Sequence, residues 1–226
     1  MLQIYQACCE NVRELKKQAK TLNRSINNAI ISNRHQEVYF LTRVYALLYS
    51  SYAEVAFLKL IHTPHGFSED YIKQIQSQRA LENKWEKCFE LAFQSISSDL
   101  DLRNKELWMR RILNEYILSP SRIRNKIAHG QWAVCLNSES TAINNDITAE
   151  LQNLDYVRIE ILFNIYSIFS QCIEDLIESP HRAHYRYFYG PLTNLEDYIN
   201  KTKSYTVTSK IAILKNSPKI CGKHGK

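Results

Sequence analysis

Glycine and proline are scarce in this sequence, which has only five of each among 226 residues. A chain with so few turn-forming residues is poorly suited to the many tight turns of a β-sandwich or a β-barrel. Hydrophobic residues make up 45% of the sequence, enough for one large core. We therefore expect an all-α fold of long helices joined by short connections.

Metal-binding and secretory signals are also lacking. The six cysteines show neither CxxC pairing nor zinc-ligand spacing, so we expect reduced, mostly packed thiols in a cytoplasmic protein. No basic segment followed by an apolar run stands at residues 1–14, so no signal peptide is expected. The HxxH pairs at His62/His65 and His181/His184 lie near prolines and are too few in ligands for zinc. We expect no metal and no other cofactor.

The most apolar stretch, residues 44–61, is short for a membrane span and contains Glu54 and Lys59. We interpret it as a buried core helix and expect no membrane association. Glu54 is the only acid in this stretch. It either pairs with Arg124 or His129 and positions that side chain, or it faces solvent at the edge of the helix.

The net charge of +6 is unevenly distributed. Residues 201–226 contain seven of the 29 Lys and Arg and no acid, whereas the other 22 face 23 Asp and Glu. The basic character of the chain therefore belongs to its C-terminal tail. Such a tail either gathers a phosphate backbone or is simply a solvated end.

Hydrophobic periodicity predicts helices over residues 2–31, 37–62, 68–96, 105–118, 120–129 and 155–178. Residues 97–101 are a predicted loop, and the polar segment 130–146 is expected to form a short hairpin or an open loop. We expect one or two short helices within 181–202 and a weakly extended segment at 207–214.

These elements predict one helical domain over residues 1–203, with a core at about 36–180, followed by a basic tail over 204–226. Neither an internal repeat nor a long linker interrupts the domain. The predicted hairpin or irregular insertion comes directly after the helix at 120–129.

Residues 119–130 form the most informative segment, Ser-Pro-Ser-Arg-Ile-Arg-Asn-Lys-Ile-Ala-His-Gly. Ser119 suits an N-cap and Pro120 suits the first helical position. Gly130 suits the left-handed position just beyond a helix end. The sequence therefore predicts a short helix that ends at His129.

This short helix carries uncompensated positive charge. Arg122, Arg124 and Lys126 lie within five residues, and no acid occurs between Glu115 and Glu139. The pair at 122 and 126 repels by a few tenths of a kcal/mol, about what like charges one turn apart cost. A cluster of like charges that no nearby acid neutralises indicates a candidate functional site, and a bound polyanion would neutralise this charge.

Helical geometry separates the two most reactive side chains of this segment. Asn125 and His129 share one helix face, whereas Arg124 lies about 140° from His129 on a straight helix. One helix therefore does not easily direct both groups at a single phosphate. Two copies related by a two-fold axis could pool them in one cleft, so we expect a homodimer.

The segment Arg124-Asn125-Lys126-Ile127-Ala128-His129 resembles the R-N-x-x-x-H form of the Arg-x(4–6)-His motif of HEPN domains. Its polar residue after the arginine and its long flanking apolar helices also match. Residues 54–64, Glu-Val-Ala-Phe-Leu-Lys-Leu-Ile-His-Thr-Pro, are similar to bacterial HEPN proteins of mobile elements and defence islands. The resemblance covers roughly residues 36–180.

The resemblance implies a HEPN-like helical bundle that dimerises and cuts single-stranded RNA without a metal, by attack of a ribose 2′-hydroxyl. Similar proteins act as cytoplasmic toxins of toxin–antitoxin pairs, in phage defence and in RNA processing. By this resemblance His129 moves a proton and Arg124 holds the charge of the phosphorane, while Asn125 orients His129 or the phosphate. Glu54, Lys126 and Arg122 are supporting candidates.

The alternative is a non-catalytic HEPN scaffold that binds RNA, a nucleotide or a protein partner.

The residues that follow the motif His bear on how the protein could be regulated. In HEPN toxins controlled by an adenylylating partner, a Tyr stands two residues after the motif His, and here that position is Gln131. The resemblance therefore does not support control by tyrosine modification, and an antitoxin or sensor protein is left open.

Overall fold

The computed structural model describes residues 2–94, 100–178 and 189–216. Within these residues the fold is all-α, as predicted, and an isolated bridge between Leu136 and Ile143 is its only β pairing. In chain order the helices are α1 (Leu2–Ile31), α2 (His35–Ile61), α3 (Glu69–Gln76), α4 (Leu81–Gln94), α5 (Leu100–Ile112), η1 (Leu113–Leu118), α6 (Ser119–Ala128), α7 (Asn145–Gln152), α8 (Tyr156–Glu178), α10 (Tyr189–Thr202) and α11 (Val207–Asn216).

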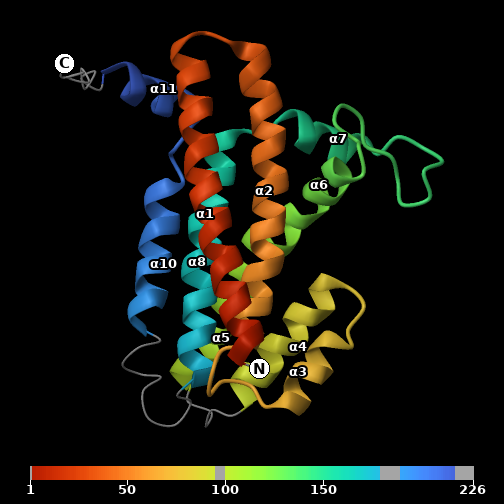
Figure 1. Ribbon diagram of the computed structural model, residues 1–226, viewed down its shortest axis with the longest axis vertical. Helices are drawn as coiled ribbons and strands as arrows, with labels where there is room; N and C mark the ends of the chain where they lie inside the picture. Colours follow the sequence, from red (N-terminus) through yellow and green to blue (C-terminus); the bar gives the residue numbers. More distant parts are fainter. Residues whose placement is uncertain (1, 95–99, 179–188, 217–226) are drawn as a thin grey trace.

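Helices α1 and α2 form a long antiparallel hairpin, and they lie side by side over most of their length (Figure 1). Asn33 in the connecting turn has a φ of 55°, a left-handed conformation that asparagine tolerates. Helix α8 packs against α2, and α10 packs against α8. The predicted helices at 2–31, 37–62 and 155–178 are therefore confirmed, with ends that move by two residues or fewer.

Aromatic residues join α2 to α8. Tyr45, Tyr49 and Tyr52 of α2 surround Phe163 of α8, with ring centroids 5.3, 5.1 and 5.0 Å from the phenylalanine ring. Each such pair adds about 1 kcal/mol beyond the burial of its area. The contacts fix α2 on α8, and α2 in turn supports α6.

Helix α2 is long and apolar enough to cross a membrane by length and composition. In this structure its apolar side chains, such as Phe57, Leu60 and Ile61, are buried within the bundle. That burial agrees with the prediction of a core helix.

The predicted helix at 68–96 is two helices, α3 and α4. Ser68 caps α3 as expected, because its hydroxyl accepts a hydrogen bond from the backbone N–H of Tyr71. The helix then ends because Ser77 and Gln78 both donate side-chain hydrogen bonds to the backbone carbonyl of Gln74. The predicted loop at 97–101 falls mostly outside the described residues, and α5 begins at Leu100.

The prediction of a separate short helix capped by Ser119 is wrong. Ser119 is itself helical, with φ −58° and ψ −47°, and α5, η1 and α6 form one continuous helical segment. The backbone N–H of Ser119 donates to the carbonyl of Asn114, five residues back, which makes η1 a π-helical turn. The wide turn lets Pro120 enter α6, where an ordinary α-turn would press its ring against the carbonyl four residues earlier.

Two helices at the polar and C-terminal parts of the chain were not predicted. Helix α7 begins at an N-cap, Asn144, whose side chain accepts from the N–H of Ile147. The expected weakly extended segment at 207–214 is wrong, because it lies in α11. Thr206 and Ser209 cap α11 reciprocally through their backbone N–H groups and hydroxyls.

The core extends beyond 36–180, since Ile26 of α1 and Leu195 of α10 are fully buried. Of the predicted segment 181–202, α10 supplies one helix and the remainder lies outside the described residues. The polar segment after α6 is a loop whose residues Leu136 and Ile143 form a single antiparallel bridge, which lies between the predicted short hairpin and the predicted open loop.

Candidate functional site

The end of α6 carries a hydrogen-bonded cap that fixes the position of His129. The N–H of Gly130 donates to the carbonyl of Ile127 (3.0 Å) and the N–H of Gln131 donates to the carbonyl of Lys126 (2.9 Å). Gly130 has a φ of 79°, as predicted for the residue just beyond the helix. The cap therefore holds the backbone of His129 at the C-cap position, directly after Ala128, the last residue of α6.

Arg124 is buried between α6 and α2, with only 5% of its surface exposed. Its Nη1 donates to the backbone carbonyl of Ser50 (3.2 Å), and its Nη2 lies 3.6 Å from Oε1 of Glu54. Its Nε has no hydrogen-bond partner within the part of the chain that the structure describes. Arg124 is therefore held in place by α2, through Ser50 and Glu54.

The residues packed around Arg124 are mostly uncharged. The hydroxyl of Tyr166 donates to the carbonyl of Ala53 (2.6 Å), and the hydroxyl of Tyr49 donates to the carbonyl of Tyr116 (3.4 Å). Burial raises the pKa of both Tyr49 and Tyr166, and the nearby guanidinium only partly offsets it. Both phenols therefore stay neutral, and Glu54 is the ion-pair partner of Arg124.

The opposite face of α6 is open to solvent. Arg122, Asn125 and His129 are exposed there, and the imidazole of His129 has no partner among residues 2–94, 100–178 and 189–216. Lys126 is only partly exposed, because its ammonium group donates to the carbonyl of Leu136 in the turn that follows α6. That contact partly offsets the charge repulsion that the sequence revealed.

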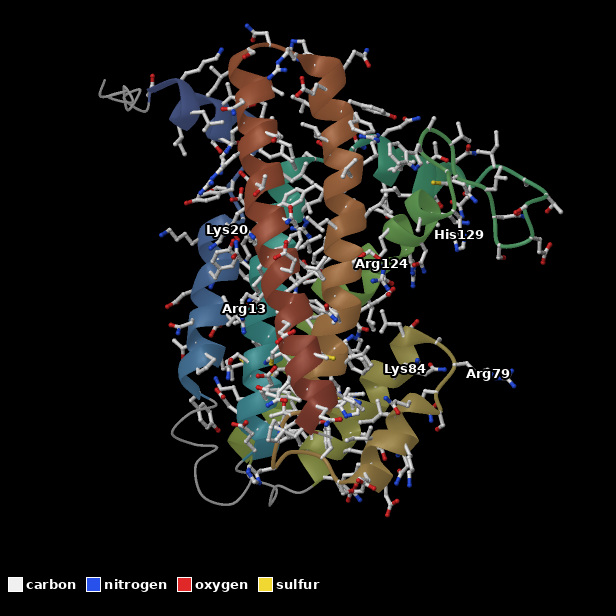
Figure 2. The ribbon with its side chains drawn as sticks, viewed as in Figure 1. Arg13, Lys20, Arg79, Lys84, Arg124 and His129 are labelled. Carbon is white, nitrogen blue, oxygen red and sulfur yellow. The ribbon has the colours of Figure 1, made fainter. Side chains whose placement is uncertain are left out.

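The structure thus brings together some of the predicted residues and separates others. It pairs Arg124 with Glu54, one of the two interpretations of Glu54, although Glu54 is also 62% exposed. It places Arg124 and His129 of one chain in different surroundings, as helical geometry predicted. Figure 2 shows both side chains on the same side of the α1–α2 hairpin, with His129 farther out.

An apolar patch next to the motif was missed by the sequence analysis. It consists of Tyr39, Phe40 and Trp132, and we call it the α2–loop patch. Phe40 and Trp132 stack at an angle with centroids 6.0 Å apart, and the hydroxyl of Tyr39 donates to the carbonyl of Trp132 (3.1 Å). Phe40 is 53% exposed. Trp132, an aromatic residue just after the motif in a segment rich in Asn, Ser and Thr, was the available signal.

A cavity of about 430 Å³ lies beside Arg124, between α2, η1, α6, α7 and α8. Tyr49, Pro120 and Leu154 contribute to its mostly apolar wall, and Arg124 lies along one side of it. His129 does not line this cavity, so the cavity does not unite the two motif residues.

The cysteines contribute no metal site among the described residues. Cys8, Cys88, Cys135 and Cys172 are buried free thiols, and Cys9 is partly buried. Burial raises the pKa of Cys8 and of Cys135. No group of three or more His, Cys, Asp or Glu converges within the described residues in a way that would hold a metal ion. His181 and His184 lie outside those residues.

No protein-family model, no curated protein and no solved structure matches this chain. A function therefore has to be inferred from the geometry and chemistry of the residues.

Proposed function

We propose that this protein is a homodimeric, metal-independent HEPN-type endoribonuclease that cuts single-stranded RNA. The observation that carries the proposal is the exposed imidazole of His129, whose backbone is capped at the end of a helix without acids, five residues after Arg124. A cation at a helix C-terminus is favoured by the helix dipole, and an exposed imidazole is suited to proton transfer.

The proposed reaction needs only proton transfer and charge stabilisation. The ribose 2′-oxygen attacks the adjacent phosphorus, the bond from phosphorus to the 5′-oxygen breaks, and a 2′,3′-cyclic phosphate and a 5′-hydroxyl result. One neutral imidazole accepts the proton of the 2′-hydroxyl, and one protonated imidazole donates a proton to the leaving 5′-oxygen. A two-fold dimer supplies two copies of His129 for these roles.

Arg124 acts in this proposal from a fixed position. The carbonyl of Ser50 and the carboxylate of Glu54 hold its guanidinium, so a phosphate that reaches Nη2 competes with Glu54. The ion pair is 3.6 Å long and partly solvated, which makes such an exchange inexpensive. Asn125 lies exposed next to it and orients either His129 or the phosphate.

Two observations support the homodimer. Arg124 and His129 of one chain face different surroundings, so a site that uses both draws on two copies. The α2–loop patch lies beside the motif and offers exposed apolar surface to a second copy. We also propose that the protein acts in the cytoplasm as a toxin or phage-defence effector, with an antitoxin or a sensor as partner.

The test compares His129→Ala with His35→Ala, which removes another exposed histidine, at the start of α2. End-labelled single-stranded RNA is incubated with each protein in EDTA, and the product ends are identified by phosphatase and kinase sensitivity. We expect wild type and His35→Ala to release 2′,3′-cyclic phosphate ends and His129→Ala to release none. Equal cutting by all three proteins would remove the proposal.

A non-catalytic binding scaffold is the second candidate, and the burial of Arg124 favours it. An arginine that is 5% exposed and bonded to a backbone carbonyl has a sufficient structural role. In that case the wild-type protein binds RNA, a nucleotide or a protein but no preparation cuts RNA.

A further inference from the structure

A groove of about 510 Å³ lined by three cationic residues lies between α1 and α8, away from the motif. Lys16, Lys20 and Arg24 line it from α1. In Figure 2 Lys20 lies on the edge of α1 that faces α8 and α10, whereas His129 lies beyond α2. The groove is therefore separate from the candidate site.

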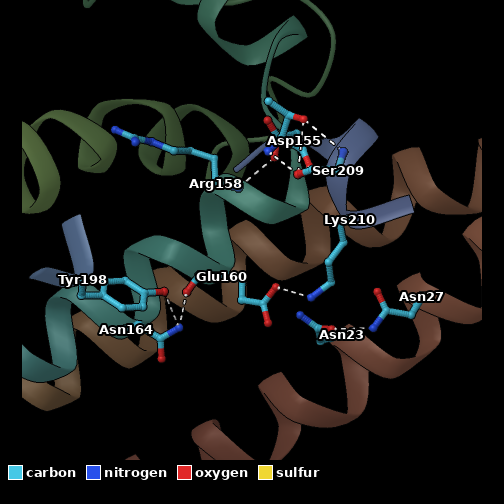
Figure 3. A network of polar contacts seen from close by, with 10 residues as sticks. Asn23, Asn27, Asp155, Arg158, Glu160, Asn164, Tyr198, Ser209 and Lys210 are labelled. Carbon is cyan, nitrogen blue, oxygen red and sulfur yellow. Dashed lines mark hydrogen bonds and ion pairs between the residues drawn. The ribbon is translucent and has the colours of Figure 1, made fainter. Parts of the chain in front are cut away.

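The positive charge of this groove is not neutralised by its own walls. Glu160 of α8 is its only acidic lining residue, and Lys210 of α11 pairs with it at 3.1 Å (Figure 3). Lys16 donates to the hydroxyl of Ser167 (2.9 Å), which is neutral. Neither Lys20 nor Arg24 forms an ion pair with any residue that the structure describes.

The spacing of these cations is regular. Each lies four residues after the previous one, so successive charges are about 6 Å apart along the helix axis. Arg13, three residues before Lys16, continues the row on the same edge of α1 (Figure 2). Like charges at this spacing repel and weaken the helix unless an external anion compensates them. Successive phosphates of a single nucleic-acid strand have a comparable separation.

From this geometry we infer that the α1–α8 groove binds the phosphate backbone of single-stranded RNA. Part of the remaining wall suits the same ligand, because Asn23 and Ser167 offer an amide and a hydroxyl group that can bind phosphate oxygens, whereas the amide of Asn164 already donates to the carbonyl of Glu160 and the hydroxyl of Tyr198. Tyr45 and Phe163 form its floor but are almost fully buried, so they offer no face on which bases could stack. The groove therefore holds RNA without selecting its sequence.

The basic C-terminal segment contributes to the groove through Lys210 of α11. Lys210 bridges α11 to Glu160 of α8, and this ion pair removes the only acid that would repel a phosphate in the groove. The inference rests on the RNA substrate proposed above, but it concerns binding and does not require cleavage.

The test measures RNA binding by fluorescence anisotropy over a series of salt concentrations. His129→Ala serves as the parent protein, so that the RNA stays intact. Lys20→Gln/Arg24→Gln removes two proposed phosphate contacts. We expect several-fold weaker binding to two RNAs of unrelated sequence, and a slope of log affinity against log salt that is smaller by about 1.4, or 0.7 per contact.

Two controls separate the groove from net charge. Lys20→Arg/Arg24→Lys keeps both charges and should bind like the parent. Arg79→Gln/Lys84→Gln removes the same charge from the turn before α4 and from α4 itself, on the other side of the hairpin (Figure 2), and should leave the slope unchanged. An equal loss in this control, or an unchanged slope in the groove variant, would overturn the inference.

Competitors identify the ligand. We expect unlabelled RNA to displace the probe and inorganic phosphate or poly-glutamate to fail at equal charge concentration. Displacement by poly-glutamate as strong as by RNA would instead indicate an acidic protein and would overturn the inference. If the wild-type protein binds RNA through the groove but never cuts it, the groove inference stands and the proposed nuclease activity is wrong. If the wild-type protein cuts RNA but the groove variant has an unchanged salt slope, the nuclease proposal stands and the groove inference is wrong.

Discussion

At the scale of single residues, the place of Arg124 follows from its neighbours in the helix. Ile127 is fully buried, and Arg124 lies one turn before it, so the arginine is carried to the buried side of α6. The sequence predicted the divergence of Arg124 and His129 and offered Glu54 as a partner. It could not predict that the carbonyl of Ser50, 74 residues away, would bind the guanidinium.

Burial and ion pairing contribute unequally to the stability that Arg124 provides. We expect Arg124→Ala to lower the free energy of unfolding by about 2 kcal/mol, through lost packing and a lost hydrogen bond to Ser50. Glu54→Gln should cost less than about 1 kcal/mol, because the carboxylate is 62% exposed. Urea unfolding of both variants measures the difference, and equal losses would mean that the ion pair dominates.

At the scale of helices, periodicity predicted the long elements and failed at their interruptions. Helices α1, α2 and α8 carry many apolar residues at helical spacing, so their pattern dominates any local signal. The division between α3 and α4 depends on side-chain hydrogen bonds at Ser77 and Gln78, and the π-turn of η1 depends on how Pro120 is accommodated. Residue types alone specify neither the side-chain hydrogen bonds that end α3 nor the π-turn that accommodates Pro120.

The cap of α6 offers a prediction at this scale. Gly130→Ala should lower the free energy of unfolding by about 1 kcal/mol, because φ is 79° there although a Cβ would meet no neighbour within 4 Å. Gly190→Ala is the matched control: it has equal space but no left-handed φ, so it should change the free energy of unfolding by less than about 0.5 kcal/mol. Chemical denaturation distinguishes them, and a neutral Gly130→Ala would show that the cap does not constrain His129.

At the scale of the whole molecule, composition and charge predicted the fold class but not the surface. Few glycines and prolines indicated long helices, and the described residues are helical almost throughout. The two surfaces proposed for dimerisation and for RNA binding, the α2–loop patch and the α1–α8 groove, each join segments that are distant in sequence. Phe40 contacts Trp132, and Lys16 contacts Ser167, 151 residues later, so neither surface was visible in any local pattern.

The α2–loop patch gives the proposed homodimer its sharpest test. Phe40→Glu places a charge in the middle of the apolar surface and should convert a dimer into a monomer in analytical ultracentrifugation, because burying an unpaired carboxylate is costly. Leu107→Glu is the control, since Leu107 is 61% exposed on α5 and lies outside the patch. If each site pools Arg124 and His129 from two copies, Phe40→Glu also loses cleavage while Leu107→Glu keeps it. A Phe40→Glu monomer that still cuts RNA would show that one chain suffices, and Arg124 would then be left with a structural role alone.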